Sequence, residues 1–348
     1  MRVGLTPGVP RVSSLRIHMV PLPIADDLSA DFNSISKDLV HRSGVPYHTF
    51  RKTLRPRYWR VWTDILLGYA GILAIAVALV KIPFPGWGSA LLAAFVASMG
   101  FGYLQHFLGL FMHEGAHYNV AGPRKLNDLL TDLLLGTLQG YSIESYRVPH
   151  FGHHRKIGTP EDPEHHYFHA LDLRLVVLTL SGVRTMKVIL ERLSGSGKVV
   201  QVESTQKTHR GPNWVVVAGG LIHGAIVVGS ILSGHWPLAL AWVLGFLTWF
   251  PFFITLREIL EHRDFDTAKD TDFTRTPHGA ISRIFGNGPV AATLGGAGFN
   301  RHLLHHWEPQ ISYTRLGELE RFLLETEAGP IIRARQVTYF STLRRLWQ

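Results

Sequence analysis

Long apolar stretches alternate with polar segments along this chain. Four stretches hold almost no charged residue, and the first of them contains Asp64 as its one charge. A helix of roughly 20 residues crosses the hydrocarbon core of a bilayer, because each residue adds about 1.5 Å to its length. The pattern therefore predicts an all-α integral membrane protein with four transmembrane helices in two hairpins, at residues 61–80, 86–112, 214–232 and 236–256.

The distribution of basic residues predicts how these helices are oriented. Connector 81–85 contains one Lys, and connector 233–235 contains neither Lys nor Arg, although the whole chain has a net charge of +9. Lys and Arg accumulate in cytoplasmic loops. We therefore expect both termini, loop 113–213 and residues 257–348 on the cytoplasmic side. The excess positive charge is then explained by topology and anionic lipid, without a nucleic-acid partner.

Weaker patterns complete the predicted organisation. Residues 126–140 and 171–190 are apolar stretches interrupted by charges, which is typical of helices that lie in the membrane interface. Residues 1–40 are rich in Pro, Asp and Ser, and we assign them no fold. We expect three parts: an N-terminal cytoplasmic segment (1–55) that is partly disordered, a membrane domain with a cytoplasmic helical cap (56–325), and a C-terminal cytoplasmic tail (326–348).

The composition restricts any metal site to nitrogen and oxygen ligands. The chain has no Cys and 20 His, which excludes disulfides, thiolate nucleophiles and iron–sulfur clusters. Eight of the histidines form three clusters with spacings of three and four residues, which place side chains on one face of a helix. Pro149 predicts that a helix begins at the second cluster. The clusters are His113 and His117; His150, His153 and His154; and His302, His305 and His306.

The number of histidines favours two metal ions. A ninth histidine, His262, follows the fourth apolar stretch on the same predicted side. A four-coordinate site uses three or four protein ligands, so nine imidazoles exceed the needs of one metal. A two-metal zinc hydrolase would also use bridging carboxylates, and Glu114 is the acidic residue inside the clusters. A metal transporter would instead place ionisable groups near the middle of the bilayer.

The clusters and their flanking residues resemble the membrane fatty acid desaturase and hydroxylase superfamily, over roughly residues 55–325. Its three boxes, HxxxH, HxxHH and HxxHH, fit residues 113–117, 150–154 and 302–306. Asn127 after the first box, RKIGTPEDP after the second, and Asn300 and WEP around the third also match. The resemblance implies a di-iron centre bound by His113, His117, His150, His153, His154, His262, His302, His305 and His306. Stearoyl-CoA desaturases have an Asn four residues before the equivalent of His262, whereas this chain has Glu258.

The resemblance implies an O2-dependent desaturase that acts on a fatty acyl chain or acyl lipid. An unactivated methylene group offers no acidic proton, so its oxidation requires a redox-active metal and O2. Hydroxylation of a lipid chain on the same scaffold is the alternative outcome. The chain lacks the His-Pro-Gly-Gly motif of a fused cytochrome b5, which implies a separate cytochrome b5-like or ferredoxin electron donor. Arg51, Lys52, Arg55 and Arg57 could steer such an acidic carrier.

Metal-bound imidazoles usually donate their second N–H to an acceptor. Among the nearby polar residues we select Glu114, Asp162, Glu258 and Asn300 as such partners. Glu258 is favoured over Glu261, because Glu261 is adjacent to His262 and adjacent helical residues do not face each other. His106 lies two turns before the first box, inside an apolar stretch, and we assign it to the surroundings of the centre or to a substrate tunnel.

Four further histidines are expected to lie outside the metal centre. His165, His166 and His169 follow Pro163 in a loop, which is typical of surface residues or of indirect partners of the site. His223 lies in the third apolar stretch among glycines, where a polar side chain commonly joins packed helices.

Overall fold

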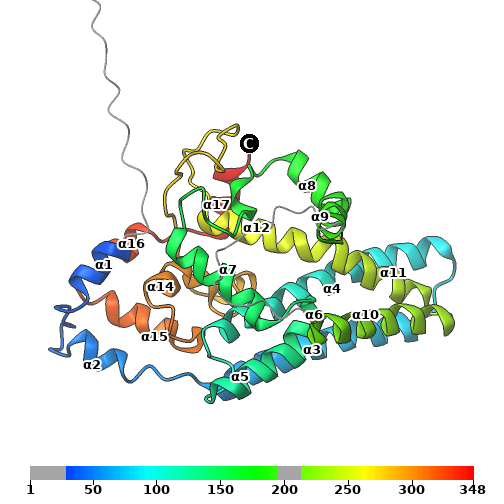
Figure 1. The fold of residues 1–348 in the computed structure, drawn as a ribbon, viewed down its shortest axis with the longest axis horizontal. Helices are drawn as coiled ribbons and strands as arrows, with labels where there is room; N and C mark the ends of the chain where they lie inside the picture. The colour runs from blue at the N-terminus through cyan, green and yellow to red at the C-terminus, as the bar shows by residue number, and fades with distance from the viewer. Residues whose placement is uncertain (1–28, 194–212) are drawn as a thin grey trace, which may run out of the picture.

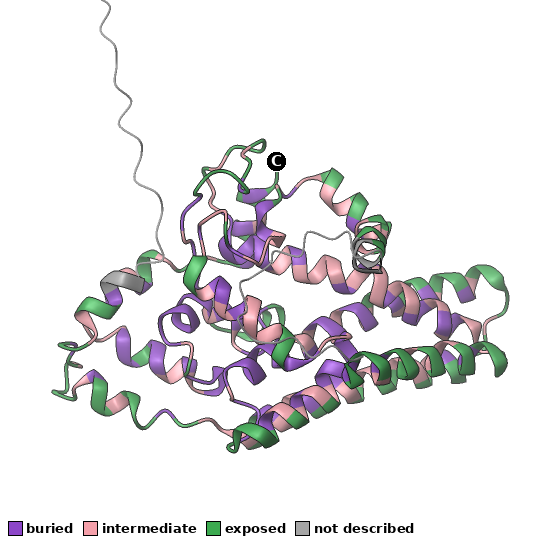
Figure 2. Cartoon of the chain, viewed as in Figure 1, coloured by how far each residue is buried: buried purple, intermediate pink, exposed green. Residues whose placement is uncertain are grey.

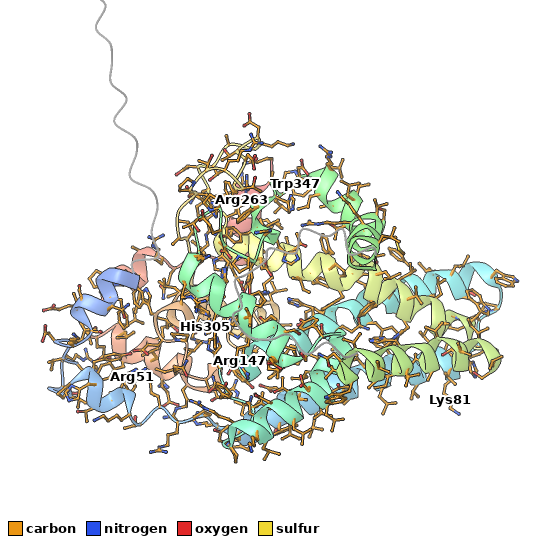
Figure 3. All side chains as sticks on the ribbon, viewed as in Figure 1. Arg51, Lys81, Arg147, Arg263, His305 and Trp347 are labelled. Carbon is orange, nitrogen blue, oxygen red and sulfur yellow. The ribbon has the colours of Figure 1, made fainter. Side chains whose placement is uncertain are left out.

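The computed structural model describes residues 29–193 and 213–348, and this part of the chain contains helices and isolated bridges but no strand. Figure 1 shows long helices that run side by side to the right, and shorter helices gathered at their other end. We call the region formed by the shorter helices of residues 143–168 and 289–323 the cap. His305 lies within the cap and Lys81 at the far end of the long helices (Figure 3).

Four long helices correspond to the four apolar stretches, and each is long and apolar enough to cross a membrane. The sequence-based prediction of these helices is confirmed. Figure 2 shows exposed residues along their outer faces and buried residues toward the inner end of α4. The four are α3 (Tyr58–Lys81), α4 (Trp87–Ala116), α10 (Trp214–Leu232) and the continuous helix Trp236–His262, which consists of α11 (Trp236–Leu244), the π-helix η3 (Gly245–Trp249) and α12 (Phe250–His262).

Helix α4 is the centre of the long-helix layer. It packs against α3, α11, η3 and α12, while α10 packs against α11. Two glycines permit the close contact of α4 with the helix Trp236–His262. A Cβ atom on Gly102 would lie 2.3 Å from the Cβ of Trp249, and one on Gly245 would lie 2.8 Å from the Cβ of Phe101. Small residues at such contacts let helix backbones approach each other. The pairing into two membrane hairpins stays a prediction.

The two weaker apolar stretches are helical, as predicted. Leu126, Leu129 and Leu133 are exposed on the first of them, which is the amphipathic pattern of an interfacial helix. Their location at a membrane surface stays a prediction. The first stretch contains α5 (Arg124–Thr131), the π-helix η1 (Asp132–Gly136) and α6 (Thr137–Gln139); the second contains α8 (Leu173–Leu180) and α9 (Val183–Leu193).

The cap carries the second and third histidine clusters. Helix α7 (Ile143–Lys156) begins before the second cluster, so the prediction that Pro149 starts this helix is wrong. Ser142 caps it instead, because its hydroxyl accepts a hydrogen bond from the Ser145 backbone N–H. The other short helices here are η2 (His166–Phe168), α13 (Pro289–Leu294), η4 (Phe299–Arg301), α14 (His302–Trp307) and α15 (Tyr313–Leu323).

Both ends of the described chain pack onto the cap. Residues 1–28 lie outside the described part. Helix α1 (Ser29–Ile35) is an ordered element, contrary to the expectation of no fold up to residue 40, and α2 (Tyr47–Arg51) follows it. The reason is aromatic burial, since Phe32 stacks on Trp307 with ring centroids 4.4 Å apart.

The C-terminal residues are likewise part of the folded structure. They form α16 (Gly329–Ala334) and α17 (Tyr339–Leu346), and α17 packs against α12. Tyr339 stacks on Phe285 with ring centroids 3.9 Å apart. The segment expected to be a tail therefore supports the helix that carries His262.

Candidate metal centre

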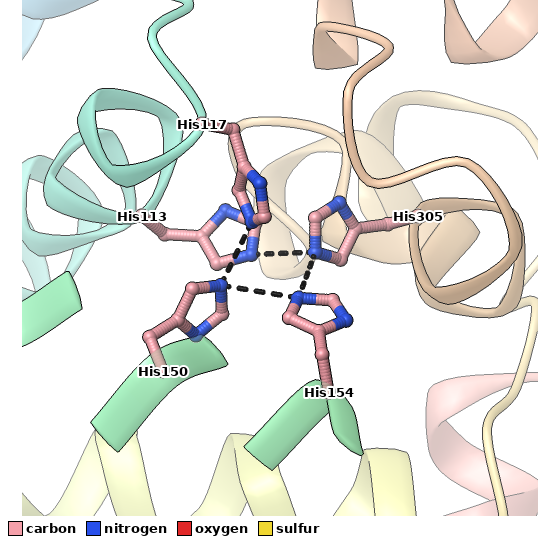
Figure 4. A group of neighbouring side chains, drawn as sticks. All are labelled: His113, His117, His150, His154 and His305. Atoms are coloured by element: carbon pink, nitrogen blue, oxygen red, sulfur yellow. Dashed lines mark hydrogen bonds between the residues drawn. The ribbon is translucent and has the colours of Figure 1, made fainter. Parts of the chain in front are cut away.

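The nine candidate histidines come together from four places in the fold. His113 and His117 lie at the end of α4, His262 lies at the end of α12, and the others lie on α7 and α14. Their ring nitrogens form two groups, and within each group the nitrogens lie within 4.8 Å of one another. The five-histidine group contains His113, His117, His150, His154 and His305 (Figure 4), and the four-histidine group contains His153, His262, His302 and His306.

Each HxxHH box contributes to both groups. On α7, His150 and His154 belong to the five-histidine group and His153 belongs to the four-histidine group. On α14 the division is reversed. His302 and His306, four residues apart, belong to the four-histidine group, and His305 belongs to the five-histidine group. Two crossing helices with this spacing therefore place two imidazole groups next to each other. The imidazole rings of His154 and His306, one from each group, lie 4.7 Å apart between centroids.

In the five-histidine group the Nε2 atoms point at one another (Figure 4). The Nε2–Nε2 distances are 2.8 Å for His113–His305, 2.9 Å for His117–His150, 3.1 Å for His150–His154 and 3.0 Å for His154–His305. Two nitrogens bound at right angles to one metal, with bonds of about 2.1 Å, are separated by roughly 3.0 Å. The observed spacing therefore fits ligands around a common ion.

In the four-histidine group a hydrogen bond fixes the protonation of His262. Its Nδ1 lies 2.7 Å from the carbonyl oxygen of Ile281. A carbonyl only accepts, so Nδ1 carries the hydrogen and Nε2 presents a lone pair. That lone pair faces His302 Nε2 at 2.9 Å, and His302 Nε2 lies 3.1 Å from His306 Nε2. The ring nitrogens of this group converge in the protein interior, and this arrangement fits a metal ion.

Burial favours the neutral form of most of these imidazoles. It lowers the pKa of His150, His302 and His305 well below the usual value, and the neutral ring is the metal-binding form. His153 differs. Burial lowers its pKa, but the charges of Glu164 and Asp162 outweigh this effect and raise the pKa to about 9. A metal at this position would replace the proton on His153.

The sequence comparison assigns the chain to a family. A model of fatty acid desaturases matches residues 85–337, well over half of the chain and including both histidine groups. The chain belongs to the fatty acid desaturase family. A search of curated proteins finds no match. Membership in the fatty acid desaturase family supports an oxidoreductase that associates with membranes and acts on lipid. Helices α1 to α3 precede the matched region.

Two acidic residues orient histidines of this desaturase-family site. Asp162 is buried and accepts hydrogen bonds from His153 Nδ1, at 2.8 and 3.0 Å, and from the Tyr167 hydroxyl at 2.6 Å. Glu164 lies 3.1 Å from His150 Nδ1. Sequence reasoning selected Asp162 but missed Glu164, although both belong to the acidic segment that follows the second box.

Glu114 lies beside His113 of the first box and contacts the start of α15. Its Oε2 accepts hydrogen bonds from the Ser312 hydroxyl and the Tyr313 backbone N–H, and its Oε1 lies 3.8 Å from His113 Nδ1. The carboxylate therefore joins the end of α4 to the start of α15.

Three other residues selected from the sequence, Glu258, Asn300 and His106, have their contacts with residues outside the two histidine groups. Glu258 accepts hydrogen bonds from His166 at 2.9 Å and from Arg257 at 3.4 Å. Asn300 donates to the Gly286 carbonyl at 2.9 Å. His106 is buried near Phe253 and belongs to neither histidine group.

Glu261 lies nearer the centre than Glu258, against expectation. Its Oε2 is 3.6 Å from His302 Nε2. The spacing along α12 relates Glu261 only to its neighbour His262. It contains no information about His302, which comes from α14.

Two further histidines, His223 and His166, have structural contacts of their own. His223 joins three helices, because Trp242 Nε1 donates to its Nδ1 at 3.0 Å and its Nε2 donates to the Leu138 carbonyl at 3.1 Å. This contact confirms the predicted packing role. His166 is partly exposed and contacts Glu258. Neither residue belongs to the two histidine groups.

Proposed function

We propose that the chain is an O2-dependent di-iron membrane desaturase that introduces a double bond into a fatty acyl chain or acyl lipid. The observation that carries the proposal is the pair of adjacent imidazole groups, which share two helices and lie inside the matched region of a desaturase family. Two iron ions, when bound, would supply the O2 chemistry that an unactivated methylene group requires.

The nine histidines would hold the iron, one ion in each group. The protein keeps Nε2 of His153 and His262 available by binding their Nδ1–H groups to Asp162 and to the Ile281 carbonyl. The groups are buried except at His154, which is partly exposed. This burial excludes bulk water from the reacting methylene.

The location of the groups suits a substrate held in a membrane. His113 and His262 end two of the four apolar helices, so a lipid chain between these helices would extend toward the metal. We infer that this end faces the cytoplasm, because the connector at the opposite end of α3 and α4 contributes a single Lys.

An external electron carrier, cytochrome b5-like or a ferredoxin, would reduce the centre. Arg51 and Arg57 contribute less to its docking than expected, because they form ion pairs with Glu308 and Glu318. We place the docking surface at the C-terminal end of α7, where exposed Arg155 and Lys156 follow His154.

A charge-reversal experiment tests this docking surface. In the double variant Arg155→Glu, Lys156→Glu, reduction by an acidic carrier should slow at low salt, with a smaller difference at high salt. Reduction at the original rate at every salt concentration would place the carrier elsewhere.

Lipid mass analysis of expressing cells tests the reaction. Desaturation removes two hydrogens from a chain, and cells that express His305→Ala should show no such product. A product with one added oxygen and no new double bond would contradict desaturation and support hydroxylation on the same scaffold.

A further inference from the structure

The Tyr167 hydroxyl lies behind the carboxylate that orients His153. Tyr167 belongs to the short helix η2 and is fully buried, as is Asp162. The hydroxyl donates to Asp162 Oδ2 at 2.6 Å, and the same oxygen accepts a hydrogen bond from His153 Nδ1 at 2.8 Å. The other ring nitrogen of His153 has no hydrogen-bond partner in the described structure. Two hydrogen bonds in series therefore join a tyrosine to a histidine of the four-histidine group.

The direction of the Tyr167 hydroxyl is fixed by contacts on its other side. Its oxygen accepts a hydrogen bond from the Gly158 backbone N–H at 3.3 Å and lies 3.0 Å from His278 Nε2. A tyrosine hydroxyl has one hydrogen to donate, and an ionised carboxylate only accepts. Because that hydrogen is directed at Asp162, the contact with His278 requires a hydrogen on Nε2. The hydroxyl is thus held by two donors while it donates to the carboxylate.

These contacts join three segments around His153. Gly158 follows α7, whereas His278 lies in the segment after α12, and the His278 backbone N–H donates to the Gly158 carbonyl at 2.9 Å. Gly158 has a φ of +81°, and a Cβ atom on it would lie 2.4 Å from the backbone nitrogen of Ala280. A glycine is therefore required where the two segments meet. Tyr167 lies at this junction and transmits its position to the carboxylate.

The Asp162 carboxylate is held from two sides. The Glu164 backbone N–H donates to Oδ1 at 2.9 Å, and the Tyr167 hydroxyl donates to Oδ2. Both oxygens also lie within 3.0 Å of His153 Nδ1. The acceptor behind a metal-bound histidine sets the orientation of its ring and contributes to metal affinity. A carboxylate that lost the hydroxyl could rotate, and the imidazole of His153 would follow it.

The Tyr167 ring has a separate contact with the same group. It packs on the imidazole of His262 with ring centroids 5.3 Å apart. His262 and His153 both belong to the four-histidine group. Tyr167→Phe keeps the aromatic ring for this packing and removes only the hydroxyl, so it separates the hydrogen bond from the ring contact.

We propose that Tyr167 is a positioning residue for the metal ion of the four-histidine group, and that it acts through Asp162 on His153. The inference rests on the proposed function, because it requires that this group binds iron. The hydroxyl is too far along the chain of contacts to be a ligand itself, since the carboxylate lies between it and the imidazole.

Tyr313 provides a matched control. It is buried, and its hydroxyl also donates to a carboxylate at 2.6 Å, that of Asp64. Asp64 lies on α3, which carries none of the nine histidines. Tyr313→Phe therefore removes an equally short hydrogen bond between the same kinds of side chain without removing support from a histidine.

The test measures iron in the purified full-length protein, loaded with ferrous ⁵⁷Fe in detergent, by titration and Mössbauer spectroscopy. Tyr167→Phe should weaken one of two iron sites by roughly tenfold, the lower end of the effect of removing a direct partner of a metal-bound histidine. It should change the Mössbauer parameters of that site. Asp162→Asn should alter the same site more strongly, and Tyr313→Phe should retain two iron ions with the original spectrum.

The outcomes separate this inference from the proposed function. If Tyr167→Phe keeps the iron affinity and spectrum of the wild type, Tyr167 is not a positioning residue. An equal loss at both iron sites, or the same loss in Tyr313→Phe, would show general destabilisation and would also contradict the proposal. If wild type binds no iron, the proposed function itself fails.

A second variant decides if Tyr167→Phe does not fold, as shown by thermal unfolding. His278→Leu removes a donor to the Tyr167 hydroxyl and leaves both Tyr167 and Asp162 in place. It should change the spectrum of the same iron site, by less than Asp162→Asn does. An unchanged spectrum in this variant would overturn the proposal.

Discussion

The two histidine groups share two helices but differ in how the protein supports them. In the four-histidine group, Asp162 and the Ile281 carbonyl fix two imidazoles, and all members are buried. The five-histidine group has Glu164 as the partner of His150 and includes the partly exposed His154. One pair of HxxHH boxes thus creates two unlike groups of imidazoles. We infer that the buried group binds its metal more rigidly and that electrons enter at the exposed one.

The largest effect is expected from removing one imidazole from either group. His302→Ala and His305→Ala lie on the same helix but in different groups. Both should abolish desaturation, because the proposed reaction uses both metal ions, and each should empty its own site first. Product analysis combined with iron content measures this. If either variant retains full turnover, that histidine is not a metal ligand.

A smaller effect is expected from substituting the carboxylates that accept hydrogen bonds from the imidazoles. Asp162→Asn should weaken iron binding by roughly 10–100-fold, because partners of metal-bound histidines typically contribute this much. The loss should be confined to the four-histidine group. Iron titration followed by Mössbauer spectroscopy of the partly loaded protein measures it.

Glu164→Gln is the matched variant for the five-histidine group. Glu164 is partly exposed whereas Asp162 is fully buried, so its effect should be smaller. Glu164 lies 3.1 Å from His150 Nδ1 and 4.0 Å from His153 Nε2, so the effect should appear mainly at the five-histidine group and more weakly at the other. If Glu164→Gln weakened the four-histidine site alone, the assignment of Glu164 as the partner of His150 would be wrong.

Contacts between the N-terminal segment and the end of α14 should stabilise the fold as a whole, and so both histidine groups. Glu308 accepts hydrogen bonds from the Tyr47 hydroxyl at 2.6 Å and from Arg51 at 2.8 Å. Glu308→Gln should lower the free energy of unfolding in detergent by about 1.5–3 kcal/mol, as expected for hydrogen bonds to a charged group. Glu318→Gln, which loses the ion pairs of a more exposed carboxylate with Arg57 and Arg315, should cost about 0–1 kcal/mol. Equal losses would contradict a special role for the N-terminal segment.

The smallest effect is expected at His166. It lies near the centre in sequence and contacts Glu258, but belongs to neither group. His166→Ala should retain both iron ions and the activity of the wild type, because its contact is with Glu258 and not with one of the nine histidines. Loss of an iron ion in this variant would show that the nine-histidine set is incomplete.

Much of the fold could be predicted because it depends on local patterns. The four long helices follow from apolar stretches, and eight of the nine histidines follow from spacings of three and four residues. His262 was selected from its place after the fourth stretch and from the family resemblance. The start of α7 was missed because Ser142, and not Pro149, caps the helix. The packing of Phe32 on Trp307 joins distant segments and leaves no local signal.

The chemistry around the histidines was predictable only in part. Which histidine enters which group depends on how α7 and α14 cross, and spacing along one helix does not contain this information. The same limit explains why Glu258 and Asn300 were selected although their hydrogen bonds lead elsewhere. Glu261 became relevant only once α14 brought His302 beside it.

Metal analysis of the purified wild-type protein, combined with ⁵⁷Fe Mössbauer spectroscopy, tests the central claim most directly. The account predicts two iron ions per chain and two distinct iron environments, which correspond to the two histidine groups. One tightly bound zinc ion without iron, or iron in a single environment at one ion per chain, would contradict it.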